Sequence, residues 1–132
     1  MGGYTTMALA IKYPQYLKAF GLLHSTALPD TPIKIENRKR GISFIEKFGA
    51  TTFLETTVPN LFGTHTKETN PGVVLDFIQA LPHFSNEALI AYYHAMMARP
   101  NLTGVLTTTT VPVLFVLGDQ DIAVALEDTL PQ

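Results

Sequence analysis

Residues 111–121 read VPVLFVLGDQD, and this stretch decides the fold. Val111 to Leu117 form an apolar run that does not alternate with polar residues. Such a run is typical of a strand buried on both faces, as in a parallel sheet. Pro112 fits the entrance of a strand, where a missing backbone N–H is tolerated. The polar residues Gly118 to Asp121 therefore lie at the C-terminal end of a predicted buried strand.

A second apolar run occupies the second half of residues 17–23, which read LKAFGLL. It also lacks alternation and predicts another buried parallel strand, after which His24 turns the chain polar. Small and apolar residues at helical spacing predict a short helix over residues 5–13, which Pro14 ends. The order helix, strand and later strand predicts an α/β protein with a parallel sheet.

The stretch between the two strands, residues 33–100, contains helical patterns only. Apolar residues that recur every third position predict a helix that ends at Gly49. Thr52 and Glu55 have the spacing of a capping box and predict the start of the next helix. The apolar residues of the helix that ends at Gly49 are Ile42, Ile45 and Phe48. Further helices are predicted to start at Asn70 with Pro71 and at Ser85. Residues 101–110 are expected to form a connector.

This helical block spans about 65 residues, far more than a crossover between parallel strands needs. We therefore expect an insertion over the C-terminal edge of the sheet, where open α/β sheets keep their sites. Residues 31–100 are expected to form this helical cap, or lid. Residues 1–30 and 101–132 are expected to form parts of the α/β core.

The composition excludes several classes of protein. The 132 residues are 46% hydrophobic, carry a net charge of −2 and include no Cys. The basic residues form no patch large enough for nucleic acid or an anionic membrane, so neither is expected as a partner. The lack of Cys removes disulfides, thiolate metal sites and cysteine nucleophiles, and it suits a reducing, cytoplasmic compartment. We expect neither a cofactor nor a metal.

The mean hydropathy of +0.18 suggests more apolar surface than so short a chain covers by itself. Two buried strands make an unstable sheet, because isolated strand pairs are marginal and each outer edge exposes unpaired backbone groups. The remaining strands come either from segments outside this sequence or from a second copy of the chain in a homo-oligomer.

Three features of the chain resemble the α/β-hydrolase fold superfamily. Met1-Gly2-Gly3-Tyr4, with Ala8-Leu9-Ala10 and Tyr13-Pro14, resembles the stretch immediately after the nucleophile. Gly118-Asp119-Gln120-Asp121 resembles the strand ending that delivers the acid of the catalytic triad. The helices between resemble the family's cap domain. The resemblance implies a partial α/β-hydrolase fold, with parallel strands and a helical cap inserted between them.

The resemblance also implies roles for individual residues. The nucleophilic serine would precede Met1, whose backbone N–H would be an oxyanion-hole donor. The family's glycine-x-x-acid spacing favours Asp121 as the triad acid over Asp119, although residue chemistry alone does not separate them. The family's frequent proline is replaced by Ala125. The triad order places the base after the acid, yet no histidine occurs beyond His94, so the chain alone is expected to be inactive.

Three further residues are candidate substrate contacts: His24, Tyr93 and Met97. His24 either lines a pocket at the C-terminal edge of the sheet or only makes a hydrogen bond in a loop. It cannot act as a base for Ser25, because adjacent residues of an extended segment point to opposite faces. Tyr93 and Met97 belong to an aromatic and methionine stripe that is expected to be cap core first and pocket lining second. The other histidines have no metal-ligand spacing.

These observations predict a segment of a hydrolase that resembles serine hydrolases acting on ester or related acyl bonds. Its expected partner is a small apolar substrate in the full-length form. The same fold hosts other reactions, so the resemblance sets the reaction only weakly. The alternative is a non-catalytic binding or self-association module derived from a truncated hydrolase.

Overall fold

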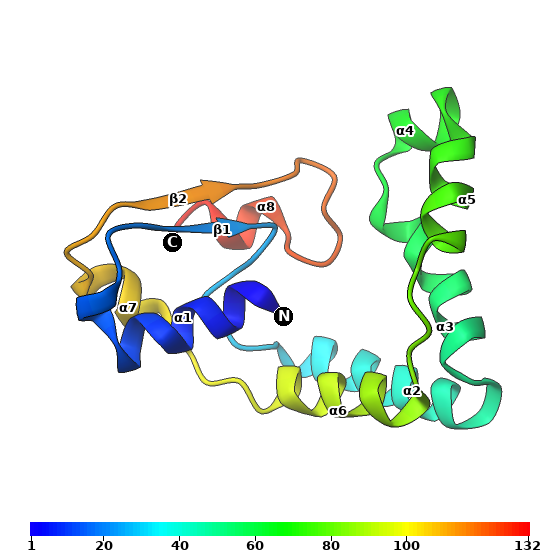
Figure 1. The fold of residues 1–132 in the computed structure, drawn as a ribbon, viewed down its shortest axis with the longest axis horizontal. Helices are drawn as coiled ribbons and strands as arrows, with labels where there is room; N and C mark the ends of the chain where they lie inside the picture. Colours follow the sequence, from blue (N-terminus) through cyan, green and yellow to red (C-terminus); the bar gives the residue numbers. More distant parts are fainter. The chain divides into compact units, whose positions relative to one another are not determined.

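The computed structural model describes all 132 residues, which divide into two compact units. Met1–Pro29 and Arg99–Gln132 form the first, called here the sheet unit, and Asp30–Ala98 form the second, called the helical unit (Figure 1). Each is described by itself. That the helical unit serves as a lid stays a prediction. No helix in the chain is both long and apolar enough to cross a membrane.

The sheet unit is built around two parallel strands, as the unalternating apolar runs predict. In chain order its elements are α1 (Gly2–Lys12), the 3-10 helix η1 (Pro14–Tyr16), β1 (Phe20–Leu23), α7 (Thr103–Thr108), β2 (Val113–Val116) and α8 (Leu126–Thr129). The register pairs Phe20 with Val113 and Leu23 with Val116. The two strands run side by side in the same direction, so their C-terminal ends meet at one edge (Figure 1).

One face of the sheet packs on α1 and α7. Alternate strand residues point to this face, and Leu22 together with Met7 of α1 is fully buried. The buried cluster consists of Met7, Ala10, Phe20, Leu22, Ala27 and Leu102. Val113 and Phe115 pack against it from β2, so both strands contribute their inward side chains to one core.

The other face of the sheet is uncovered, which corrects the prediction that both strands are buried on both faces. Leu23 is 67% exposed and Leu114 is 64% exposed. Unalternating apolar residues indicate a strand made for burial on two sides. Within the 132 residues, however, helices cover only the side of Leu22, so the apolar residues of the other side meet solvent.

Helix α1 begins at Gly2, three residues earlier than predicted, and its Gly3 lies against the segment after β1. A Cβ on Gly3 would come within 2.1 Å of Ser25 Oγ, so only glycine fits there. A Cβ on Gly2 would meet nothing within 4 Å. Close packing therefore explains one of the two glycines and not the other.

Helix α7 lies in residues for which the sequence predicts only a connector. Its threonines hide the helical pattern, because β-branched residues have low helix propensity. Two of them, Thr107 and Thr108, donate their hydroxyls to the carbonyl of Gly104 within the helix. Asn101 supports the start, since its Oδ1 accepts hydrogen bonds from the backbone N–H and the hydroxyl of Thr103.

The helical unit contains helices only, as predicted. Its elements are α2 (Pro32–Phe48), α3 (Ala50–Thr57), the 3-10 helix η2 (Val58–Leu61), α4 (Thr64–Thr69), α5 (Pro71–Gln79) and α6 (Asn86–Met97). Its core joins α2, α3 and α6 through the buried residues Ile45, Ala50, Phe53 and Leu89. Phe48, the last member of the predicted apolar row, is half exposed, and its ring lies tilted against that of Phe44.

The helix boundaries confirm most of the predicted caps and correct one. Ser85 Oγ accepts the N–H of Ala88 at the start of α6, and Gly49 ends α2 with a positive φ of 89°. Asn70 and Pro71 open α5 as N-cap position and first residue, although the Asn70 side chain makes no cap hydrogen bond. The capping box at Thr52 and Glu55 is wrong, because α3 already begins at Ala50. There the side chain of Asn86 accepts the Ala50 N–H at 2.7 Å, which replaces a local cap.

Candidate active site

The candidate site lies where β1 and β2 end. His24 directly follows β1, and its backbone N–H donates to the carbonyl of Val116 at the end of β2. Asp121 lies in the loop between β2 and α8, in a turn closed by a hydrogen bond from its N–H to Gly118. Because the strands are parallel, two residues that are 97 positions apart come together at the same edge.

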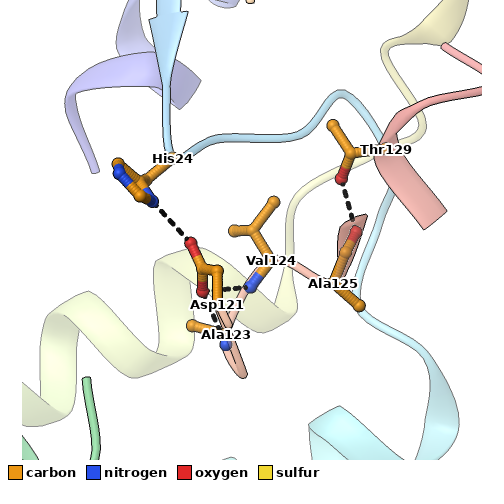
Figure 2. A network of polar contacts seen from close by, with 6 residues as sticks. All are labelled: His24, Asp121, Ala123, Val124, Ala125 and Thr129. Carbon is orange, nitrogen blue, oxygen red and sulfur yellow. Dashed lines mark hydrogen bonds and ion pairs between the residues drawn. The ribbon is translucent and has the colours of Figure 1, made fainter. Parts of the chain in front are cut away.

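The carboxylate of Asp121 is held on both oxygens (Figure 2). Oδ1 accepts the backbone N–H groups of Ala123 at 2.8 Å and Val124 at 2.9 Å. Oδ2 lies 2.8 Å from Nδ1 of His24. An Asx turn of this kind forms locally, since an aspartate readily accepts the N–H groups two and three residues ahead. The side chain of Asp121 is thus fixed before any further group binds it.

The environment of Asp121 favours its charged form. Partial burial alone would raise the pKa of Asp121, but the N–H of Val124, the imidazole of His24 and the N–H of Ala123 together lower that pKa below its ordinary value. An ionised carboxylate only accepts hydrogen bonds, so Nδ1 of His24 carries the proton of this contact. The pair is therefore an ionised carboxylate that accepts a hydrogen bond from an imidazole N–H.

Asp119 differs from Asp121 in its surroundings. The side chain of Asp119 is exposed and makes none of the three contacts that hold Asp121. The side chain of Asp121 keeps only 12% of its surface exposed. Of the two carboxylates that the sequence offers, Asp121 is therefore the one with a fixed orientation.

The position of His24 depends on its own backbone and on Gly118. His24 has a φ of 47°, the one positive φ among the non-glycine residues of the chain. A Cβ on Gly118 would lie 2.9 Å from Cε1 of His24, so the imidazole occupies space that a side chain at position 118 would need. Positive φ at a non-glycine residue costs energy and is a known feature of functional sites.

A cavity of about 310 Å³ adjoins His24 at the start of α1. Its lining residues are Met1, Gly2, Gly3, Tyr4, Thr6, Gly21, Leu23, His24 and Ser25. Met1, the predicted oxyanion-hole donor, therefore lies in the same cavity wall as His24. The first N–H groups of a helix have no acceptor within the helix and favour negative charge nearby.

Ser25 and His24 contact different groups. Ser25 is buried, and its Oγ lies against Gly3 of α1, whereas the imidazole of His24 faces Asp121. The prediction that the two cannot act as a base and nucleophile pair assumed an extended segment, whereas His24 has a φ of 47°, so it stays a prediction.

Tyr93 and Met97 belong to α6 of the helical unit. Tyr93 packs edge-on against Phe53 at 5.7 Å and under the guanidinium of Arg38 at 5.3 Å. Burial raises the pKa of Tyr93, and the charge of Arg38 offsets part of that rise. Met97 is half-buried at the last turn of α6. These contacts give Tyr93 a packing role, and substrate contact by either residue stays a prediction.

The chain contains no cluster of side chains suited to a metal ion, and a larger cavity lacks acid–base groups. No three His, Asp or Glu side chains of the chain lie close enough to hold a metal ion. A larger cavity of about 490 Å³ lies beside α7 and ahead of β2. Apolar, threonine, proline, glycine and asparagine residues line it, and none of them titrates, so it offers no acid–base chemistry.

Sequence reasoning placed His24 and Asp121 at the edge of the sheet but did not join them. It also missed Gly118 as the space for the imidazole and the Ala123 and Val124 N–H groups as donors. The contact between His24 and Asp121 could have been predicted from the parallel pairing, because both residues follow predicted parallel strands, whose C-terminal ends lie at one edge.

Comparisons with known proteins give a consistent family and fold. The family model of the Ndr family matches residues 1–130. An esterase from Thermogutta terrifontis has a similar structure, with a TM-score of 0.82 and 29% identity over 96% of this chain and 47% of that chain. An enol-lactonase from Burkholderia xenovorans LB400 gives a TM-score of 0.81 and 22% identity over 97% of this chain and 48% of that chain, which shows the fold alone.

The chain spans about half the length of these two solved structures. No curated protein matches the chain.

Proposed function

This chain belongs to the Ndr family, an α/β-hydrolase-fold family, and from that premise we propose that it carries the acid of an ester-hydrolysing triad. The acid is Asp121. The nucleophile and the base are supplied by polypeptide outside these 132 residues. The reaction is hydrolysis of an ester or related acyl bond in a small apolar substrate.

One observation carries the proposal. The carboxylate of Asp121, beyond the C-terminal end of β2, is held by hydrogen bonds, one of them to an imidazole. Two backbone N–H groups hold Oδ1, and Oδ2 lies 2.8 Å from His24 Nδ1. An acid that works through a histidine must keep one oxygen available to an imidazole N–H. Oδ2 of Asp121 meets that need, because an oxygen of a carboxylate accepts more than one hydrogen bond.

The reaction follows the serine-hydrolase scheme. The serine oxygen attacks the acyl carbon while the histidine takes the hydroxyl proton, and that proton then leaves with the alcohol. Water repeats the sequence on the acyl enzyme and releases the acid. Asp121 would hold the histidine in the productive tautomer and stabilise its cationic form. The Met1 backbone N–H would stabilise the oxyanion in these steps.

The chain by itself is inert under this proposal. Its four histidines, His24, His65, His83 and His94, all precede Asp121, whereas the triad order places the base after the acid. The preference for small apolar acyl groups is supported by the aromatic and methionine residues of the helical unit, among them Tyr93 and Met97.

A chimera tests the proposal. This chain replaces the matched part of the Thermogutta terrifontis esterase, and the product is tested for a cooperative thermal transition and for hydrolysis of p-nitrophenyl esters. We expect a folded chimera to hydrolyse the esters. The 132-residue chain alone should show no burst of p-nitrophenol and no labelling by serine-reactive phosphonates. A folded but inactive chimera, or robust labelling of the chain alone, would contradict the proposal.

A second candidate function, a non-catalytic self-association module, is favoured by the uncovered face of the sheet. Leu23 and Leu114 are mostly exposed there, and a second copy of the chain would cover them. Light scattering on the purified chain tests this candidate. A stable symmetric oligomer together with an inactive chimera supports it, and a monomer at high concentration excludes it.

A further inference from the structure

We propose that His24 is a positioning residue for Asp121. Its Nδ1–H donates to Oδ2, fixes the plane of the carboxylate and leaves a second acceptor position on that oxygen for the base. This inference rests on the proposed function, because it assigns His24 to the same site.

The hydrogen bonds on Asp121 divide into two kinds. Oδ1 is held by Ala123 and Val124, which belong to the same loop as Asp121 and move with it. Oδ2 is held by His24, which comes from the end of the neighbouring strand. His24 therefore links the carboxylate of Asp121, in the loop after β2, to the end of β1. Without the His24 contact, the carboxylate would keep its hydrogen bonds to Ala123 and Val124 but lose its hydrogen bond to the end of β1.

His24 has the features of a residue built for one position. Its backbone adopts a φ of 47°, which an L-residue takes only at a cost. The strain places the imidazole over Gly118, where no Cβ stands in the way of Cε1. A loop histidine that merely faced solvent would need neither the strain nor the glycine.

The exposures of the two side chains fit a positioning role. The side chain of Asp121 is 12% exposed, whereas that of His24 is 52% exposed. The partly open imidazole also lines the cavity at the start of α1. The carboxylate is therefore more enclosed than the imidazole that holds it.

The charges around Asp121 support the same view. Among the contacts on its carboxylate, His24 supplies the only side chain, and the others are backbone N–H groups. The contact with His24 contributes to the lowered pKa of Asp121, against the opposing effect of burial. Asp119 is the nearest other acid in sequence and does not share these donors.

The first experiment reads the carboxyl group directly in the 132-residue chain. Carbon-detected NMR follows the titration of Asp121 in the wild type and in the His24→Ala, His24→Asn and His94→Asn variants. We expect His24→Ala to raise the titration midpoint of Asp121. His24→Asn should restore most of the wild-type midpoint, because an asparagine N–H can take the place of Nδ1–H. His94→Asn removes an exposed imidazole of α6 and should change nothing.

A second pair of variants separates positioning from general structure. Gly118→Ala should raise the Asp121 midpoint in the wild-type background, because the new Cβ displaces the imidazole. In the His24→Ala background the same change should have no effect. The truncated side chain leaves the space open there, and the next atom, Asp121 Cβ, lies at an ordinary 3.7 Å. Equal effects of Gly118→Ala in both backgrounds would overturn the inference.

Kinetics of the chimera connect the contact to the reaction. His24→Ala should lower kcat by about ten- to a hundred-fold with little change in KM, as expected when a catalytic group is misplaced. His24→Asn should recover most of kcat. An unchanged Asp121 midpoint in His24→Ala, or an unchanged kcat in an active chimera, would overturn the positioning role. An inactive chimera counts against the proposed function. The NMR titration of the chain then still tests the contact between His24 and Asp121.

Discussion

The imidazole Nδ1 of His24 lies 2.8 Å from the carboxylate Oδ2 of Asp121, although the two residues are 97 positions apart in the chain. The contact arises because β1 and β2 are parallel and end in register, with Leu23 opposite Val116. It makes the C-terminal edge of a two-stranded sheet into an ordered polar site.

Asp121 should make the stability of the chain depend on acid pH. The pKa of Asp121 in the folded chain lies below its ordinary value of 3.8, because the N–H and imidazole donors outweigh the opposing effect of burial. Its contribution to stability is therefore present above that ordinary value and is lost as the pH falls through the lowered pKa. Urea unfolding at neutral and acid pH should show less loss of stability in Asp121→Asn than in the wild type, with Asp119→Asn behaving as the wild type. If Asp121→Asn loses as much stability on acidification as the wild type does, the pKa of Asp121 is not lowered in the folded chain.

Gly3 and Gly2 should respond in opposite ways to alanine. Gly3→Ala places a Cβ 2.1 Å from Ser25 Oγ and 2.6 Å from Ser25 Cβ, so we expect a loss of about 1–3 kcal/mol. Gly2→Ala meets no atom and should be neutral or stabilise by up to about 1 kcal/mol through helix propensity. Ser25→Gly should rescue Gly3→Ala, whereas Ser25→Ala should not, since it keeps the Cβ. Equal free energies of unfolding for Gly2→Ala and Gly3→Ala would contradict the close packing.

Asn86 should matter more for α3 than Thr52 does. Asn86→Ala leaves the Ala50 N–H without its acceptor, and losses of helix caps cost about 1 kcal/mol. Thr52 lies inside α3, so Thr52→Ala should be neutral or slightly stabilising. Thermal unfolding of both variants checks this. A larger loss in Thr52→Ala would restore the capping box that the structure rejects.

The two faces of the sheet should tolerate truncation differently. Leu22 is fully buried beneath α1, so Leu22→Ala should cost about 2–5 kcal/mol. Leu114 is mostly exposed, and Leu114→Ala should change the free energy of unfolding by less than about 0.5 kcal/mol in the isolated chain. Chemical denaturation measures both. A large loss in Leu114→Ala would show that something covers this face in solution.

Local patterns in the sequence predict the elements of this fold well. The unalternating runs predict both strands and their parallel pairing, and Gly49 and Ser85 predict helix ends through chemistry that acts within a few residues. The failures involve distant partners. The true start of α3 depends on Asn86, which is 36 residues away, and no local spacing reveals that contact.

The candidate site shows the same division. The position of Asp121 after a buried strand is visible in the sequence, and so is the polar turn at His24. Their contact requires the register of β1 against β2, together with the positive φ of His24 and the space over Gly118. The mean hydropathy predicts apolar surface that this chain does not cover, but not that it lies at Leu23 and Leu114, because an apolar run does not show which element covers each face.

The central claim is that Asp121 is the acid of the triad, and kinetics of two asparagine variants test it most directly. In the chimera with the Thermogutta terrifontis esterase, Asp121→Asn should lower kcat by about a thousand- to ten-thousand-fold, because the base then loses its orienting carboxylate. Asp119→Asn should stay within about threefold of the unsubstituted chimera, as expected for an exposed residue outside the reaction. Full activity in Asp121→Asn, or a loss confined to Asp119→Asn, would contradict the account.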